Sequence, residues 1–159
     1  MHVDSANRHL SNRATASPGM LLAVLLSGIL LTGCSDQPAA SGQVEVRDPY
    51  VHPPVADRTT TAGYFELRNH SDNTVRITGA SSPVAERIEL HTHIHEDGMM
   101  RMRQVQEVSV EAGEAIAFEP GGHHLMLFGV QAMPENQVSL TLTLDGAPDL
   151  TLEFSVRPR

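Results

Sequence analysis

Two histidines and two methionines in one stretch of this chain have the types and the spacing of a metal site. They are His91, Met102, His124 and Met126, and they follow one another as H-x10-M-x21-H-x-M. Imidazole nitrogen together with thioether sulfur suits copper, and the soft thioether favours Cu(I) over Zn(II). We therefore take these four side chains as candidate ligands of a copper ion.

A turn sequence predicts how the first two candidates are brought together. Asp97-Gly98 is typical of a two-residue hairpin loop. With that loop, His93 pairs with Met102 and His95 pairs with Met100, and directly opposed residues share one face of a sheet. The hairpin is therefore expected to carry histidines and methionines on one face. His93, His95 and Met100 are auxiliary candidates for metal contacts.

Alternation of apolar residues predicts that these side chains face away from the core. In the segment 87–95 one apolar stripe is expected inside, consisting of Ile88, Leu90 and Ile94. The segment 123–130 alternates in the same way, with its leucines expected inside and His124 and Met126 outside. Residues 121 and 122, both glycine, allow a tight turn just before it. The sequence alone does not establish that the two segments meet.

The elements around this stretch are predicted to be short strands. The candidates are 43–48, 62–68, 74–80, 87–95, 99–105, 108–110, 115–119, 123–130, 137–144 and 150–156. Clusters of Gly, Pro, Asn and Asp separate them, and no stretch sustains a helical period beyond two turns. Strands at this spacing favour an all-β domain, either a β-sandwich or a Greek-key barrel.

The N-terminal segment is predicted to be a targeting sequence. Residues 1–33 combine a polar, arginine-bearing start with an apolar run that is short for a membrane span. The run ends in Leu31-Thr32-Gly33-Cys34, which resembles a bacterial lipobox. We expect cleavage before Cys34 and lipidation of its sulfur, with 34–42 as a flexible tether and 43–157 as the folded domain.

Composition excludes several classes of function. The chain has 159 residues, a net charge of −8 and only arginine as its basic residue. It carries no basic stripe, which argues against a nucleic-acid binder. Cys34 is the sole cysteine, so a blue-copper electron carrier lacks its thiolate ligand. A metalloenzyme using His91, His93 and Glu89 stays open, although no general base accompanies them and the methionines would be unexplained. A purely structural sandwich would also leave the outward methionines unexplained.

The four-residue motif, with Gly-Gly-His-His-Leu-Met-Leu at 121–127, resembles the periplasmic copper chaperone family PCu(A)C over 43–157. The resemblance implies a cupredoxin-like Greek-key β-barrel and Cu(I) ligand roles for His91, Met102, His124 and Met126. It implies delivery of copper to the Cu(A) centre of cytochrome c oxidase, alongside Sco-type proteins. We expect a non-enzymatic monomer, held by its lipid anchor at the periplasmic face of the inner or outer membrane.

One position departs from the family pattern. Many members have methionine two residues after the first histidine, where this chain has His93. A second imidazole there would add a ligand or extend the preference of the site toward Cu(II). A metal-sequestering or resistance protein, and a metalloenzyme on the same fold, are the alternative functions.

Overall fold

Short segments of alternating burial build an all-β domain, seen in a computed structural model that describes residues 39, 40 and 42–159. Within those residues the strands are β1 (Ala39–Ala40), β2 (Val44–Val51), β3 (Thr61–Asn69), β4 (Val75–Ser81), β5 (Arg87–Glu96), β6 (Met99–Gln104), β7 (Val108–Val110), β8 (Ala115–Phe118), β9 (His124–Phe128), β10 (Gln137–Asp145) and β11 (Leu150–Val156). Each of the strands predicted from alternation is present, with ends displaced by three residues at most.

The N-terminal boundary differs from the expected tether. Ala39–Ala40, inside the predicted linker 34–42, form β1 and pair with β2. Alanine has little strand propensity, so nothing in the sequence marks this pair as a strand. The predicted leader 1–33 and the predicted lipidation site Cys34 lie outside the described residues. Of the residues described, none forms a helix that is long and apolar enough to cross a membrane.

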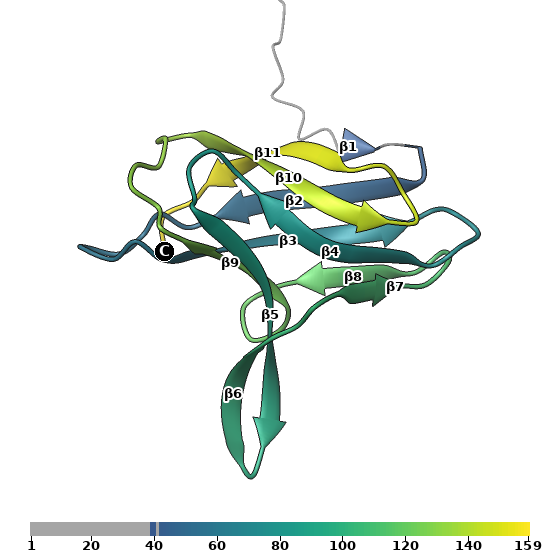
Figure 1. Ribbon diagram of the computed structural model, residues 1–159, viewed down its shortest axis with the longest axis horizontal. Coiled ribbons are helices and arrows are strands. Elements are labelled where there is room, and N and C mark those ends of the chain that lie inside the picture. The colour runs from purple at the N-terminus through teal and green to yellow at the C-terminus, as the bar shows by residue number, and fades with distance from the viewer. Residues whose placement is uncertain (1–38, 41) are drawn as a thin grey trace, which may run out of the picture. The chain divides into compact units, whose positions relative to one another are not determined.

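The strands form a closed barrel, because both ends of the pairing order return to the same strand. Hydrogen bonding runs β2-β11-β10-β4-β5-β9-β3, and β3 pairs again with β2 (Figure 1). Of these pairings, β2 with β11 is parallel, and the others are antiparallel. The short strands β6, β7 and β8 pair with the sides of β5, β4 and β3. The predicted β-barrel architecture is confirmed, and β5 and β9 are neighbours in its wall.

Period-two alternation places an aliphatic core inside the barrel. On β10, Val138, Leu140, Leu142 and Leu144 are buried, as predicted. Burial of one such aliphatic side chain stabilises the fold by about 1.5–3 kcal/mol. Aromatic packing is confined to a few contacts, for example the stacked rings of Phe65 and Phe118 with centroids 4.3 Å apart.

One polar side chain, Asn69, is fully buried at the end of β3. Its amide nitrogen donates hydrogen bonds to the backbone carbonyls of Asn73, Val110 and Glu111 at 2.7, 3.0 and 3.2 Å. Its amide oxygen accepts hydrogen bonds from the backbone and side chain of Ser71. Apart from Val110, the last residue of β7, these partners belong to connecting segments, so Asn69 ties two loops to the barrel.

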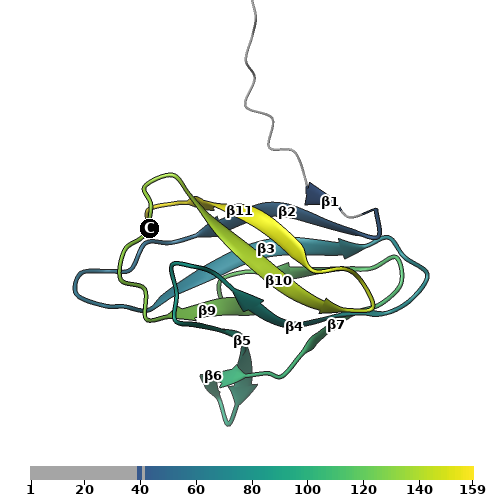
Figure 2. The same cartoon turned by 45° about the horizontal axis from the view of Figure 1, so that its top comes forward.

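The hairpin of β5 and β6 projects from the barrel (Figures 1 and 2). Ile88 and Leu90, at the start of β5, are buried in the core, as predicted. Ile94 is 36% exposed, so its prediction as a core residue is wrong. The reason is that β5 continues past the barrel at this point. Beyond the wall both faces of the two-stranded ribbon are open to solvent.

The hairpin turn has the expected loop chemistry. Asp97 and Gly98 have φ angles of 52° and 76°, the left-handed conformation that a type I′ turn needs at both central positions. On the face opposite the histidines, the Glu96 carboxylate accepts a hydrogen bond from Arg103 at 3.1 Å and lies 3.6 Å from Arg101. The turn and this ion-pair cluster therefore hold the ribbon without using its histidines or methionines.

Candidate metal centre

Strand register brings the four predicted ligands onto one face of three neighbouring strands. His91 on β5 is directly paired with His124 on β9. Met126 follows two residues after His124 and therefore projects on the same side. On the other side of β5, His93 pairs with Met102, as the hairpin register predicted. Met102 is thus a diagonal neighbour of His91 on the same face.

The imidazole rings have spacings that fit a shared metal ion. The ring centroids of His91 and His124 are 5.8 Å apart, and those of His93 and His124 are 5.1 Å apart. An ion bonded to two imidazole nitrogens at about 2.0 Å leaves the centroids roughly 5–6 Å apart. Either histidine of β5 can therefore share an ion with His124.

Glu89 fixes the proton position on His91. The Glu89 carboxylate lies 2.8 Å from His91 Nε2. A carboxylate only accepts hydrogen bonds, so in the neutral ring Nε2 carries the proton and Nδ1 keeps its lone pair. His91 Nδ1 is buried and has no hydrogen-bond partner among the described residues, and His93 Nδ1 is in the same state. A buried unpaired acceptor of this kind is what a metal ion would satisfy.

The charge state of Glu89 is set by its neighbours on the same face. Hydrogen bonds from His91 and from Arg87 Nε, the latter at 2.6 Å, lower the pKa of the Glu89 carboxyl. Glu89 is therefore ionised at neutral pH and remains an acceptor for His91. A carboxylate behind a ligating imidazole orients the ring and raises its basicity.

In His124 the proton lies on the other ring nitrogen, Nδ1. Its Nδ1 lies 3.2 Å from the Gly122 carbonyl, which can only accept, so Nδ1 donates and Nε2 keeps its lone pair. The same carbonyl accepts the His93 backbone N–H at 3.3 Å. The φ angle of Gly121 is +85°, a conformation that favours glycine and turns the chain into β9. The glycine pair thus anchors both histidines at the end of the barrel.

The prediction that His124 faces outward needs a correction. Its side chain lies on the face opposite the buried Leu125, yet His124 is only 2% exposed. The rings of His91, His93 and Tyr64 lie over it, with centroids 5.8, 5.1 and 6.4 Å away. Burial lowers the pKa of His124, and the nearby histidines lower it further. The imidazole is therefore neutral, as a metal ligand must be.

The methionines differ in exposure. Met102 is 42% exposed on the ribbon, whereas Met126 is partly buried in the barrel wall. Nearer the turn, the auxiliary candidates His95 and Met100 face each other, with Nδ1 3.4 Å from Sδ. The site therefore combines enclosed imidazoles with an exposed thioether on the ribbon.

Two residues in this region were not identified as part of the copper site from the sequence. The sequence places Glu89 only in the alternative metalloenzyme site, although its position two residues before His91 puts both on one strand face. Tyr64 comes from β3, whose pairing with β9 no local signal predicts. Burial raises the pKa of Tyr64, so its hydroxyl stays protonated.

His52 and His70 contact groups outside this site, and none of the site residues lines the surface hollow. His52 Nδ1 lies 2.6 Å from the Arg157 carbonyl, and His70 Nε2 lies 2.9 Å from Glu45.

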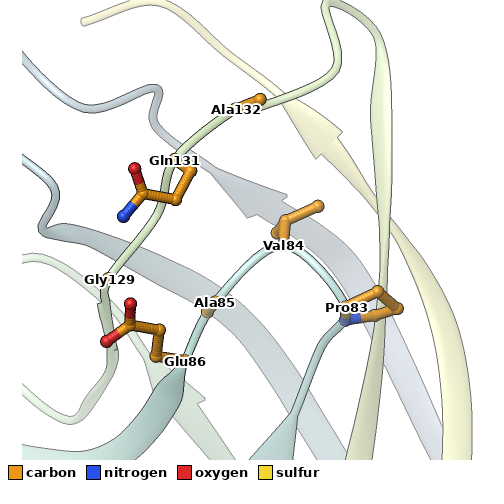
Figure 3. A pocket seen from close by; sticks show the side chains of 7 residues that line it. All are labelled: Pro83, Val84, Ala85, Glu86, Gly129, Gln131 and Ala132. Atoms are coloured by element: carbon orange, nitrogen blue, oxygen red, sulfur yellow. The ribbon is translucent and has the colours of Figure 1, made fainter.

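Figure 3 shows a hollow without imidazole or thioether groups. Its lining residues are Pro83, Val84, Ala85, Glu86, Gly129, Gln131 and Ala132. In the described part of the chain, no three His, Cys, Asp or Glu side chains gather as a metal site.

Sequence comparison places residues 44–156 in the family described as "Putative lipoprotein LpqE-like". A relative from Leifsonia xyli subsp. xyli, "Putative lipoprotein Lxx21020", is 29% identical over 141 residues. That match covers 82% of this chain and 84% of the relative. The region matched by the family, 44–156, contains strands β2 to β11 and the candidate metal centre.

Solved structures with the same architecture include a copper-bound PCuAC domain from PmoF2. It matches with a TM-score of 0.66 and 19% identity, over 77% of this chain and 99% of that domain. The solution structure of CuI-DR1885 from Deinococcus radiodurans matches with a TM-score of 0.57 and 25% identity, over 79% of this chain and 83% of that protein. These matches confirm the predicted cupredoxin-like fold and the resemblance to PCu(A)C domains.

Proposed function

The chain belongs to the LpqE-like family, and from that premise we propose that it is a copper chaperone that binds one Cu(I) ion tightly at the end of its barrel. His91 Nδ1, His124 Nε2 and the sulfurs of Met102 and Met126 are the ligands. His93 is an additional nitrogen donor that can replace His91 or extend the site to Cu(II). The similarity to a Cu(I)-bound protein supports this assignment.

The observation that carries the proposal is the pairing of His91 with His124. Each ring gives one N–H to a fixed acceptor, Glu89 or the Gly122 carbonyl, and keeps the lone pair of its other nitrogen. The two lone pairs are therefore available before any metal arrives. Preorganised ligands of this kind lose little conformational entropy on binding. The thioethers add selectivity for Cu(I).

The exposure of Met102 supports a carrier that also releases its ion. A partner can displace this thioether first and then take the imidazoles in turn, so the ion is never free in solution. We include in the proposal delivery to the Cu(A) site of cytochrome c oxidase, directly or with a Sco-type protein. The acceptor would approach along the exposed face of the ribbon.

A lipid on Cys34 would hold the domain at a membrane outside the cytoplasm. The description of the family and the name of the relative from Leifsonia xyli both contain the words "Putative lipoprotein", which supports this part of the proposal. The residues between Cys34 and β2 would set the distance of the barrel from the lipid. The periplasmic face of the inner or outer membrane is the proposed location.

Two other functions make different predictions for the same site. A sequestering or resistance protein would bind copper but would not pass it to an acceptor. A metalloenzyme would need His91, His93 and Glu89 around one ion, whereas Glu89 already accepts a hydrogen bond from His91. The methionines on the shared face favour the carrier over the enzyme.

Metal titration followed by transfer tests the proposal. The purified full-length protein would be titrated with Cu(I), Cu(II) and Zn(II) under anaerobic conditions, and the Cu(I) form mixed with an apo Cu(A) domain. We expect one tightly bound Cu(I) and weak Zn(II) binding. An acceptor loaded with two Cu(I) ions should show the Cu(A) absorption bands after one-electron oxidation with ferricyanide. Tight Cu(I) binding without transfer to any acceptor would favour sequestration. Preference for Zn(II) would overturn the proposal.

A further inference from the structure

The tip of the ribbon carries a second pair of copper-type donors. His95 and Met100 are directly paired across β5 and β6, and His95 Nδ1 lies 3.4 Å from Met100 Sδ. With metal–nitrogen and metal–sulfur bonds of about 2.0–2.3 Å, one ion can bond to both atoms without moving the backbone. Met100 is 58% exposed, although methionine is usually buried. The sulfur is therefore accessible from solvent.

This pair is separate from the site at the barrel end. His95 lies four residues beyond His91 on a continuous strand, which corresponds to roughly 13 Å along β5. Both side chains project from the same face and so run parallel, and a short, rigid imidazole does not reach across this spacing, so His91 and His95 do not bond to the same ion. His93 and Met102 are paired across β5 and β6 at the position between His91 and His95. The face thus presents His–Met pairs at successive positions from the barrel to the turn.

The geometry of the tip does not depend on these donors. The type I′ turn at Asp97 and Gly98 and the cluster around Glu96 hold the ribbon from its ends and from its opposite face. Because these other interactions hold the two strands together, the side chains of His95 and Met100 are available to bind a ligand. They can also be altered without loss of the hairpin.

We propose that His95 and Met100 form a second Cu(I) site at the ribbon tip, weaker than the first, through which copper enters and leaves the barrel site. This inference rests on the proposed function. Two ligands leave open positions on the ion, which a donor or acceptor protein can occupy while the ion is still held. An imidazole and a thioether select the same ion as the barrel site, since thioethers bind Zn(II) poorly.

Stoichiometry in matched variants tests the tip site. The purified full-length protein and its variants would be titrated anaerobically with Cu(I) against a chromophoric chelator. Methionine methyl groups labelled with ¹³C would report by NMR which sulfur binds at each equivalent. We expect two equivalents in the unaltered protein, the second at least tenfold weaker. Met100→Leu and His95→Ala should bind one, whereas Met99→Leu should still bind two. Met99 is an equally exposed neighbour on the opposite face of the ribbon, so it is the matched control.

The outcomes separate this inference from the proposed function. The Met126→Leu variant should lose the tight equivalent and keep the weak one. Binding of a single equivalent that Met126→Leu weakens and Met100→Leu leaves unchanged would overturn the tip site alone. Loss of the tight equivalent in Met100→Leu would also overturn it, because one extended site would then be present. Failure of the unaltered protein to bind any Cu(I) would overturn both proposals.

Discussion

His91 and His124 are direct partners across β5 and β9, with ring centroids 5.8 Å apart. The two residues are far apart in the sequence. They become neighbours because β5 pairs with β9 in the barrel wall, so the same pairing that closes the barrel forms the site. Their opposite hydrogen-bond patterns, to Glu89 on one side and to Gly122 on the other, leave a free nitrogen on each ring. The following predictions test what these contacts do.

Removal of either thioether should weaken Cu(I) binding. Met102→Leu and Met126→Leu keep the side-chain volume but remove the sulfur, so each should lower the Cu(I) affinity at least about tenfold, which corresponds to about 1.4 kcal/mol. Competition titration with a Cu(I) chelator gives the measurement. Met133→Leu is the control, because Met133 packs against the core. Unchanged Cu(I) affinity in the double variant would remove both methionines from the ligand set.

Glu89→Gln should weaken metal binding without unfolding the protein. The amide no longer carries the charge that holds the proton on His91 Nε2, and loss of such a partner typically costs 10- to 100-fold in metal affinity. Cu(I) titration and a thermal melt of the metal-free protein measure both effects. Glu153→Gln, on the exposed face of β11, should change neither. An unaltered affinity in Glu89→Gln would mean that Glu89 does not position His91.

His93→Met should weaken the binding of Cu(II) relative to that of Cu(I). His93 lies 5.1 Å from His124 by ring centroids, closer than His91 does, and Cu(II) prefers imidazole to thioether. We expect weaker Cu(II) binding by at least about tenfold, with Cu(I) affinity kept or increased. Electron paramagnetic resonance of the Cu(II) form counts the nitrogen ligands. The same nitrogen count in the variant would exclude His93 from the Cu(II) site.

The metal-free protein should lose stability as the pH falls below about 6.5. Burial lowers the pKa of His124 relative to the unfolded value of about 6.5, so the unfolded chain binds the proton first. The stability contribution is complete above about pH 6.5 and declines as the pH falls toward the lowered pKa. Urea unfolding at pH 7.5 and 5.5 measures the change. His124→Gln should reduce this pH dependence, and His95→Gln, at an exposed position beside the uncharged Met100, should preserve it. The same pH dependence in both variants would assign the effect to other groups.

Asn69→Ala should destabilise the fold by about 2 kcal/mol or more. The substitution removes hydrogen bonds from one buried backbone carbonyl, that of Val110, and from partly buried backbone groups of Asn73 and Ser71, and a buried group left without a partner costs about 1–3 kcal/mol. Denaturant unfolding gives the difference in the free energy of unfolding. Asn136→Ala, in an exposed connection, is the control and should stay within about 0.5 kcal/mol. Equal stability of the two variants would mean that water replaces the lost contacts of Asn69.

Local patterns predicted most of the secondary structure and the hairpin register. Period-two alternation located most of the strands of the barrel wall because each of these buries a single face. Asp97-Gly98 fixed the pairing of His93 with Met102 because a type I′ loop admits one register. These features depend on residues close together in the sequence, which is why they could be predicted without coordinates.

Features that depend on distant contacts could not be predicted in the same way. The pairing of β5 with β9 follows from barrel closure, and no local pattern encodes it. The burial of His124 comes from rings on β3 and β5. The alternation within β9 therefore predicted which face of the strand carries His124 but not that the side chain is buried there. Ile94 follows the alternation of a core residue, but the sequence does not say where the barrel wall ends. Asn69 is buried because two loops converge on it.

The solvent exposure of Met100 and Met102 makes the ribbon sensitive to oxidants. Peroxide and hypochlorite convert an accessible thioether into a sulfoxide, which is polar and presents oxygen instead of a soft sulfur donor. Because residues 35–159 contain no cysteine, no thiol in this region competes for the oxidant. The more enclosed Met126 would be the last of these sulfurs to react. Repair by methionine sulfoxide reductases would then restore the ribbon, so oxidation there is reversible damage.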